Sequence, residues 1–115
     1  MAPPHLAPFT EAGSLVFLSG QLPFDATRSI SSTDIGGQTE QVLSNIATVL
    51  GQAGLTLADV VKTTVWLRNA ADFAAFNDSY AACFGAHRPA RSTVVSELVV
   101  AEALIEIEAV AQRPA

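Results

Sequence analysis

The sequence contains little cysteine, little positive charge and no long apolar run, and each shortage excludes a class of protein. Cys83 is the single cysteine, so an internal disulfide is excluded and we expect a reducing, cytoplasmic location. Cys83 and the two histidines, His5 and His87, show no metal-ligand spacing, and we expect neither a metal nor a cofactor. Residues 1–8 hold no lysine or arginine, so we expect no signal peptide. No apolar stretch approaches the roughly 20 residues that cross a bilayer, so we expect no membrane partner.

Positive charge is scarce, with 6 lysines and arginines against 11 aspartates and glutamates and a formal net charge of −5. Proteins that bind nucleic acid need clustered cations that displace counterions from the phosphates. Here only Arg88 and Arg91 lie close together in sequence. We therefore do not expect nucleic acid as the main partner.

Apolar residues, by contrast, are abundant. They make up 50% of the chain, and only 15% of residues are charged against a usual value of about 25%. The 115 residues fit one domain spanning 1–115. On so small a body, an apolar surplus predicts a surface that another subunit covers, and the alternative is a well-filled core.

Hydrophobic periodicity predicts the order strand, helix, strand, helix, strand, strand. We expect strands over 15–20, 60–67, 91–98 and 103–111, helices over 35–53 and 70–84, and a possible short strand over 28–31. Asp34 and Asn69 are placed to cap the two helices. This order predicts an α/β (α+β) fold with two helices on one face of a mixed sheet. The other face of the sheet would remain apolar and uncovered unless subunits share it.

Common catalytic motifs are missing from the sequence. There is no Gly-x-Ser-x-Gly elbow, no Gly-x-Gly-x-x-Gly fingerprint and no P-loop, so serine hydrolase, dinucleotide and nucleoside triphosphate sites lack support. Cys83 falls on the apolar stripe of the second helix, where we expect it to be buried for packing. His87 is expected in a solvated loop.

Three polar residues remain as candidates for a functional site, and for each of them a role without function stays open. Arg91 follows Pro89 at a strand start, where a stiff backbone would hold its guanidinium for paired hydrogen bonds to a carboxylate; the alternative is a surface cation. Glu106 lies within an apolar strand, so its carboxylate is either paired with another group or on the solvent-exposed face of the sheet. Asn77 lies between Phe73 and Tyr80 and is either functional or an ordinary polar residue of a helix face.

Segments along nearly the whole chain, from about Pro8 to Ala111, resemble the RidA family, also called YjgF/YER057c/UK114-like. The segments are LSGQ at 18–21, QT at 38–39, VLSNI at 42–46, AG at 53–54, DVVKTTV at 59–65, DFAAFN at 72–77, PARSTV at 89–94 and IEIEA at 105–109. The PARS segment together with IEIEA downstream is the most specific part of the resemblance.

The resemblance implies a chorismate-mutase-like fold that assembles as a homotrimer with a central barrel of sheets and pockets between subunits. It implies an enamine and imine deaminase that needs no metal or cofactor and converts 2-aminoacrylate-type imino acids to 2-keto acids and ammonia. Arg91 would bind the substrate carboxylate, and Glu106 would orient water or exchange a proton. The backbone at Thr93 would orient water. The resemblance also places Ser19, Gly20, Asn77 and Phe9 in or near the pocket.

Some positions depart from the family pattern. Phe9 stands where many members have a tyrosine, which removes one hydroxyl, and Thr93 replaces a cysteine found in some members. Residues 96–102 lack the Leu-Pro pair and the basic residue that are common there. Other functions stay open: a binding module for small carboxylates, a ribonuclease as reported for some relatives, and a holdase, which would need exposed apolar surface.

Overall fold

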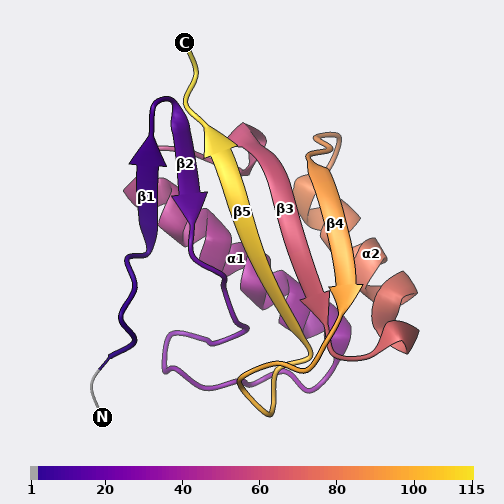
Figure 1. The fold of residues 1–115 in the computed structure, drawn as a ribbon. Coiled ribbons are helices and arrows are strands. Elements are labelled where there is room, and N and C mark those ends of the chain that lie inside the picture. The colour runs from indigo at the N-terminus through magenta and orange to yellow at the C-terminus, as the bar shows by residue number, and fades with distance from the viewer. Residues whose placement is uncertain (1–2) are drawn as a thin grey trace.

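The computed structural model describes residues 3–115, and a five-stranded sheet forms its centre (Figure 1). The strands are β1 (Phe9–Ala12), β2 (Leu15–Leu18), β3 (Val60–Leu67), β4 (Ala90–Val95) and β5 (Ile105–Gln112). Across the sheet the order is β1-β2-β5-β3-β4. β3 and β4 are parallel, and the other neighbouring pairs are antiparallel, so the sheet is mixed as predicted.

Two helices, α1 (Ile35–Gln52) and α2 (Phe73–Phe84), lie on the same face of this sheet (Figure 1). α1 begins where the Asp34 carboxylate accepts a hydrogen bond from the Gly37 amide at 2.7 Å, which confirms the predicted cap. Apolar side chains of both helices and of alternate strand positions form one hydrophobic core between the two layers. Within residues 3–115, neither helix is long and apolar enough to cross a membrane.

Side chains of β5 alternate between the two faces of the sheet, as the sequence predicts. Ile105, Ile107 and Ala109 are buried beneath the helices, whereas Glu106 and Glu108 lie on the opposite side. We call that uncovered side the open face. Its neighbouring strands add Phe17, Lys62, Thr64, Trp66, Ser92 and Val94. The open face therefore mixes charged, polar and apolar residues, and it is not the apolar surface that the pattern predicted.

Several predicted boundaries were wrong. β1 was not predicted, although it forms a hairpin with β2. The segment 28–31 is a loop, because the Asp25 carboxylate accepts hydrogen bonds from the Thr27 and Ser29 amides and Arg28 has a φ of 61°. Asn69 makes no side-chain cap; a 3₁₀ turn over Ala70–Asp72 leads into α2 instead. Thr56 precedes a short 3₁₀ turn over Leu57–Asp59 that leads into β3.

Two polar side chains fix the loop that joins β4 to β5. The buried Gln38 amide donates hydrogen bonds to the carbonyls of Ser32 and Glu102 at 3.0 Å each and accepts one from the Leu104 amide at 2.7 Å. Arg68 donates to the carbonyls of residues 103 and 100 at 2.8 and 2.9 Å. These bonds pair buried polar groups that would otherwise be costly, so the loop is held in one position beside the open face.

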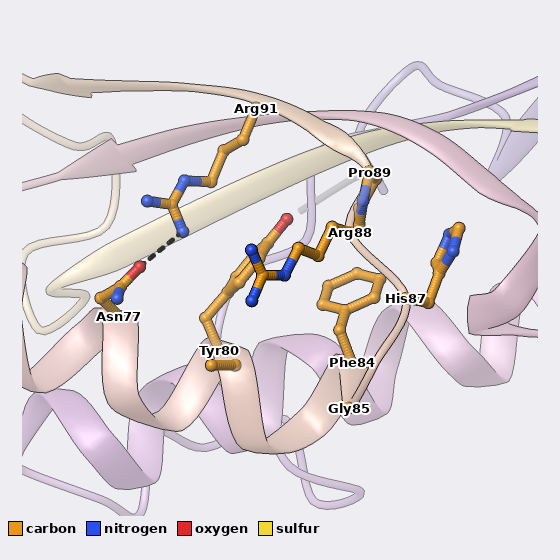
Figure 2. Close-up of a pocket in the computed structure, with 9 residues that line it drawn as sticks. Asn77, Tyr80, Phe84, Gly85, His87, Arg88, Pro89 and Arg91 are labelled. Carbon is orange, nitrogen blue, oxygen red and sulfur yellow. Dashed lines mark hydrogen bonds between the residues drawn. The ribbon is translucent and has the colours of Figure 1, made fainter.

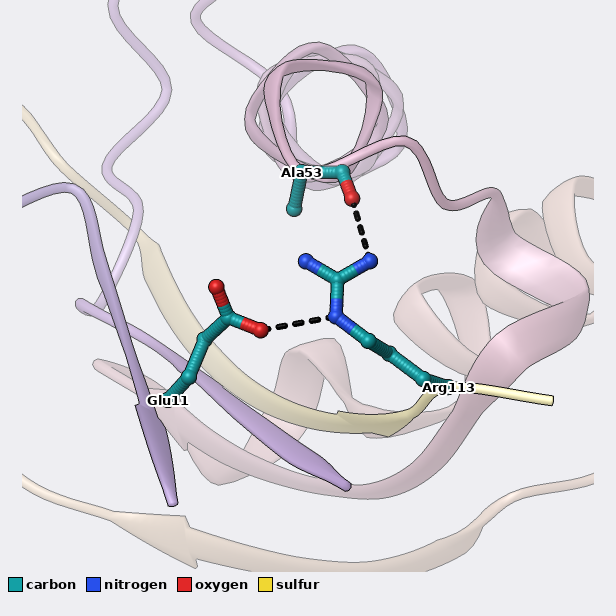
Figure 3. Close-up of polar contacts among 3 residues, drawn as sticks. All are labelled: Glu11, Ala53 and Arg113. Carbon is teal, nitrogen blue, oxygen red and sulfur yellow. Dashed lines mark hydrogen bonds and ion pairs between the residues drawn. The ribbon is translucent and has the colours of Figure 1, made fainter. Parts of the chain in front are cut away.

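Arg113, just after β5, joins three elements at a corner of the molecule that we call the C-terminal corner (Figure 3). Its Nε donates to Glu11 Oε1 on β1 at 2.7 Å, and its Nη1 donates to the Ala53 carbonyl at the end of α1 at 2.8 Å. The sequence analysis did not identify this residue. Its guanidinium satisfies a helix-end carbonyl and an exposed carboxylate together.

Candidate active site

Arg91 lies near the start of β4, and its side chain projects to the helix side of the sheet (Figure 2). Its register partner on β3, Thr63, is buried against α2. The Arg91 Nη1 donates a hydrogen bond to Asn77 Oδ1 at 2.9 Å. A guanidinium carries five N–H donors, and within residues 3–115 this one makes no other hydrogen bond or ion pair. Most of its donors are therefore available to a ligand.

Aromatic rings of α2 support the guanidinium. The Arg91 Cζ lies 5.7, 5.1 and 4.8 Å from the ring centroids of Phe73, Phe76 and Tyr80, within the range of cation–π attraction. The Tyr80 hydroxyl lies 2.7 Å from Thr63 Oγ1, and both residues are buried. Burial raises the pKa of Tyr80, so its hydroxyl stays neutral at neutral pH. The rings and the hydroxyl pair form a fixed platform beneath Arg91.

An open pocket of about 380 Å³ lies between α2 and the segment that enters β4. Asn77, Tyr80, Phe84, His87, Arg88 and Arg91 are among the residues that line it (Figure 2). This lining includes two guanidinium groups and no carboxylate. The pocket is therefore a cationic site on a chain whose net charge is negative.

The sequence predicted that His87 lies in a solvated loop, and this prediction was wrong. It is half-buried beside the Phe84 ring, and its Nε2 lies 2.7 Å from the Val60 carbonyl oxygen. A carbonyl oxygen only accepts, so the Nε2 carries the proton in this bond. His87 thereby ties the pocket wall to the start of β3.

Cys83 packs half-buried against the core, in line with its predicted packing role. Burial, and then the charge of Glu40, raise the pKa of this thiol, which keeps it protonated and a poor nucleophile. Within residues 3–115, no three histidine, cysteine, aspartate or glutamate side chains gather in a way that would hold a metal ion.

Glu106 occupies a separate position on the open face of β5. Its register partner on β3 is Trp66, and both residues border a hollow of about 280 Å³ beside the loop 96–99. Gly20 lies against the Glu106 carboxylate so closely that a Cβ at position 20 would collide with Oε2. Burial, and then the charge of Glu108, raise the pKa of Glu106. A carboxyl with a raised pKa accepts a proton more readily at neutral pH than an ordinary glutamate.

The other predicted site residues are spread around the sheet. The Ser19 hydroxyl, next to Gly20, donates to the Ala7 carbonyl at 2.6 Å. Thr93 shares the helix side of β4 with Arg91, and β4 is an edge strand with backbone groups that face away from β3. Phe9 packs against the core on β1, at the opposite edge of the sheet.

The predicted site residues thus lie in two separate groups, which we call the half-sites. Arg91 and Asn77 meet on the helix side, and Glu106 and Gly20 meet on the open face. The register partners of Arg91 and Glu106 on β3 are three positions apart, and an odd separation along a strand puts side chains on opposite faces. Within one chain, the two residues predicted to be catalytic therefore do not converge.

Sequence analysis missed the aromatic platform and Arg88. Phe73, Phe76 and Tyr80 belong to the apolar face of α2, and their rings also lie within cation–π range of the Arg91 guanidinium. One signal in the sequence could have indicated the platform. Asn77 follows Phe76 directly, which places a polar hydrogen-bond acceptor at the edge of the apolar stripe of α2. Arg88 was noted only for its charge.

Comparison with known proteins gives consistent matches over almost the full chain. A family model described as Endoribonuclease L-PSP matches residues 2–113. The 2-iminobutanoate/2-iminopropanoate deaminase of Salmonella typhimurium is 38% identical over 118 residues, which cover 97% of this chain and 92% of the relative. The 3-aminoacrylate deaminase RutC of Acinetobacter baylyi is 42% identical over 113 residues, with coverage of 95% and 90%.

Solved structures extend this likeness to the fold. A crystal structure of E. coli TdcF with bound serine superposes with a TM-score of 0.90 at 33% identity, covering 98% of this chain and 91% of that one. The mixed sheet with two helices on one face is therefore the fold of these relatives, as the sequence resemblance implied. With a family model that spans residues 2–113 and relatives of this identity, the chain belongs to the YjgF/RidA/UK114 family.

Proposed function

We propose that this protein is a deaminase that hydrolyses reactive imines and enamines of the 2-aminoacrylate type to 2-keto acids and ammonia. The observation that carries the proposal is the Arg91 guanidinium, which Asn77 and the α2 rings hold beside a pocket without carboxylates. A fixed, planar guanidinium binds a carboxylate through paired, charge-assisted hydrogen bonds. The names of the Salmonella and Acinetobacter relatives support the same reaction class.

The reaction needs little from the protein, because the imine carbon is already electrophilic. An enamine first takes a proton at its terminal carbon and gives up one from nitrogen, and so becomes the imine. Water then adds to the imine carbon, and the C=N electron pair and a proton go to nitrogen. The C–N bond of this adduct breaks, nitrogen leaves as ammonia with a further proton, and the hydroxyl becomes the keto oxygen. Catalysis therefore consists of holding the carboxylate, placing one water and moving protons.

Glu106 is the residue that we assign to proton transfer. Its pKa is raised by burial, and then by Glu108, which makes the carboxylate a stronger base for taking a proton from the attacking water and returning it to nitrogen. Gly20 keeps the space beside the carboxylate free of a side chain. We assign water orientation to the backbone at Thr93, and we assign Ser19 and Phe9 to a wall that a neighbouring copy of the chain would add to the pocket.

The two half-sites combine when copies of the chain associate. We infer a homotrimer in which Arg91 of one copy faces Glu106 of its neighbour. The inference is supported by the separation of Arg91 and Glu106 on opposite faces, by the unpaired edge of β4, and by exposed Phe17, Val94 and Val99 on or beside the open face.

Replacing Arg91 tests the proposal directly. We expect Arg91→Ala to lower kcat/KM for the imine made in situ from alanine by an amino-acid oxidase by about 100-fold, because a charge-assisted pair is lost. The measurement is keto-acid release in competition with semicarbazide. Arg28→Gln removes an exposed arginine from a loop outside the pocket and serves as the control. If Arg91→Ala folds and keeps the wild-type rate, or if the wild type matches the uncatalysed rate, the proposal is wrong.

Mixing two inactive variants tests whether the site is shared. When Arg91→Ala and Glu106→Gln chains are unfolded and refolded together in equal amounts, about a quarter of the sites in a cyclic oligomer receive both native residues. We expect the mixture to regain about a quarter of wild-type activity. Each variant refolded alone is the control. A mixture no more active than its parts would place both residues in one chain's own site and contradict the shared site.

A second candidate function is the binding of a small carboxylate without turnover. The bound serine in the TdcF structure favours it, because serine is a small molecule with a carboxylate. Calorimetry with 2-oxobutanoate separates the two functions. Binding that Arg91→Ala removes, in a protein that does not accelerate imine hydrolysis, would support a binding module instead.

A further inference from the structure

Arg88 gives the pocket a second guanidinium, which the proposed reaction on a substrate with one carboxylate does not use. Arg88 and Arg91 both line the cavity of about 380 Å³, and Figure 2 shows both side chains on the side of the sheet that faces α2. Arg91 donates one hydrogen bond, to Asn77. Within residues 3–115, Arg88 makes no hydrogen bond or ion pair through its side chain.

The backbone explains why the two cations share one pocket. Pro89 lies between them and fixes its own φ, so Arg88 belongs to the short segment after α2 while Arg91 belongs to β4. The segment is held from behind by the hydrogen bond between His87 and the Val60 carbonyl. Arg88 therefore starts from a fixed position at the rim, although its own side chain is exposed.

Two like charges in one pocket repel each other, and nothing in the lining compensates them. The pocket contains no carboxylate, and the single ion pair within residues 3–115 joins Arg113 to Glu11 in the C-terminal corner. The chain as a whole is negative, so the pocket is not part of a general basic surface. A ligand with two negative groups would bind both guanidinium groups and remove the repulsion.

We propose that Arg88 is a specificity-determining residue that selects imino acids with a second carboxylate, the imines of acidic amino acids with four or five carbons. The proposal rests on the deaminase function proposed above. Arg91 binds the carboxylate next to the imine carbon, and Arg88 binds the carboxylate at the end of the side chain. The reaction is unchanged: water adds to the imine carbon, the C–N bond breaks, and ammonia and a 2-keto dicarboxylate leave.

The test compares two imines made in situ by amino-acid oxidases, one from glutamate and one from alanine, with the purified full-length protein. We expect the wild type to prefer the glutamate-derived imine. Arg88→Gln should lower the ratio of kcat/KM between the two imines by at least about tenfold, because one charge-assisted interaction is lost for one substrate only. Arg28→Gln makes the same change of charge in a loop outside the pocket and should leave the ratio as in the wild type.

The outcomes separate this inference from the function on which it rests. If the wild type hydrolyses the alanine-derived imine and Arg88→Gln leaves the ratio unchanged, the deaminase proposal stands and the role of Arg88 is wrong. If neither imine is hydrolysed, the deaminase proposal fails, and calorimetry with 2-oxoglutarate and 2-oxobutanoate decides. Tighter binding of 2-oxoglutarate that Arg88→Gln abolishes would support the two-carboxylate site; equal affinities would overturn it.

Discussion

The C-terminal corner and the pocket beside α2 use the same side chain in opposite ways. In the C-terminal corner, Arg113 donates hydrogen bonds to Glu11 and to the Ala53 carbonyl, so it joins β1, β5 and α1. In the pocket, Arg91 donates one hydrogen bond and rests on aromatic rings, which fix its plane without using its N–H groups. Cation–π support thus leaves donors free that hydrogen bonds to the protein would have used. This difference distinguishes a structural arginine from one that is available to a ligand.

An arginine-to-lysine substitution at Arg91 and at Arg113 tests whether the two arginines differ in this way. Lysine keeps the positive charge but lacks the planar fork. We expect Arg91→Lys to lower kcat/KM for the alanine-derived imine by about tenfold or more and to change the melting temperature little, since a lysine ammonium keeps a donor for the single internal hydrogen bond, the one to Asn77. Steady-state kinetics and thermal unfolding measure the two effects. A large loss of stability with unchanged kinetics would show that Arg91 is structural.

Arg113→Lys should give the reverse result. A lysine cannot reach Glu11 and the Ala53 carbonyl in the same arrangement, so one of these contacts is lost. We expect the melting temperature to fall by about 5 °C, as the loss of a single hydrogen bond does in a domain of this size. Activity per folded protein should stay at the wild-type level. Reduced activity at full stability would mean that the C-terminal corner contributes to the site.

We expect the smallest effect for the pH dependence of the stability that the C-terminal corner contributes. The hydrogen bond from Arg113, and then the Arg113 charge, hold the pKa of Glu11 below its ordinary value of 4.5. The folded chain therefore binds this proton less readily than the unfolded chain does, so the contribution to stability is complete above pH 4.5 and is lost as the pH falls through the lowered value. Urea unfolding of wild type and Glu11→Gln should differ slightly at neutral pH and converge in acid. A difference that grew in acid would contradict this account.

Much of the fold was predictable because the pattern in the sequence is local. The stripe of α1, the Asp34 cap and the alternation along β5 each reflect a periodicity that the chain itself imposes. β1 was missed because Phe9–Ala12 has only four residues and one partly buried side chain, which gives no readable alternation. The strand becomes stable through its pairing with β2, and that pairing is not visible in the sequence of either strand.

The site was predictable only in part, because its residues come from separate elements. The residues and the family resemblance together predicted a site with Arg91, Asn77 and Glu106, and the structure brings the first two together. That Arg91 and Glu106 lie on opposite faces depends on the registers of β3 with β4 and β5, which no local pattern specifies. The position of Arg88 likewise depends on how the segment after α2 turns into β4.

The order of the strands also has a consequence for the newly made chain. β5 is the last of the five strands to be synthesised, yet it lies in the middle of the sheet between β2 and β3. Before it emerges from the ribosome, the early hairpin and the later parallel pair have no backbone ladder between them. Until β5 is made, the edges of β2 and β3 that it later joins have no partner strand, and unpaired strand edges are where an incomplete chain is most exposed to association with other chains.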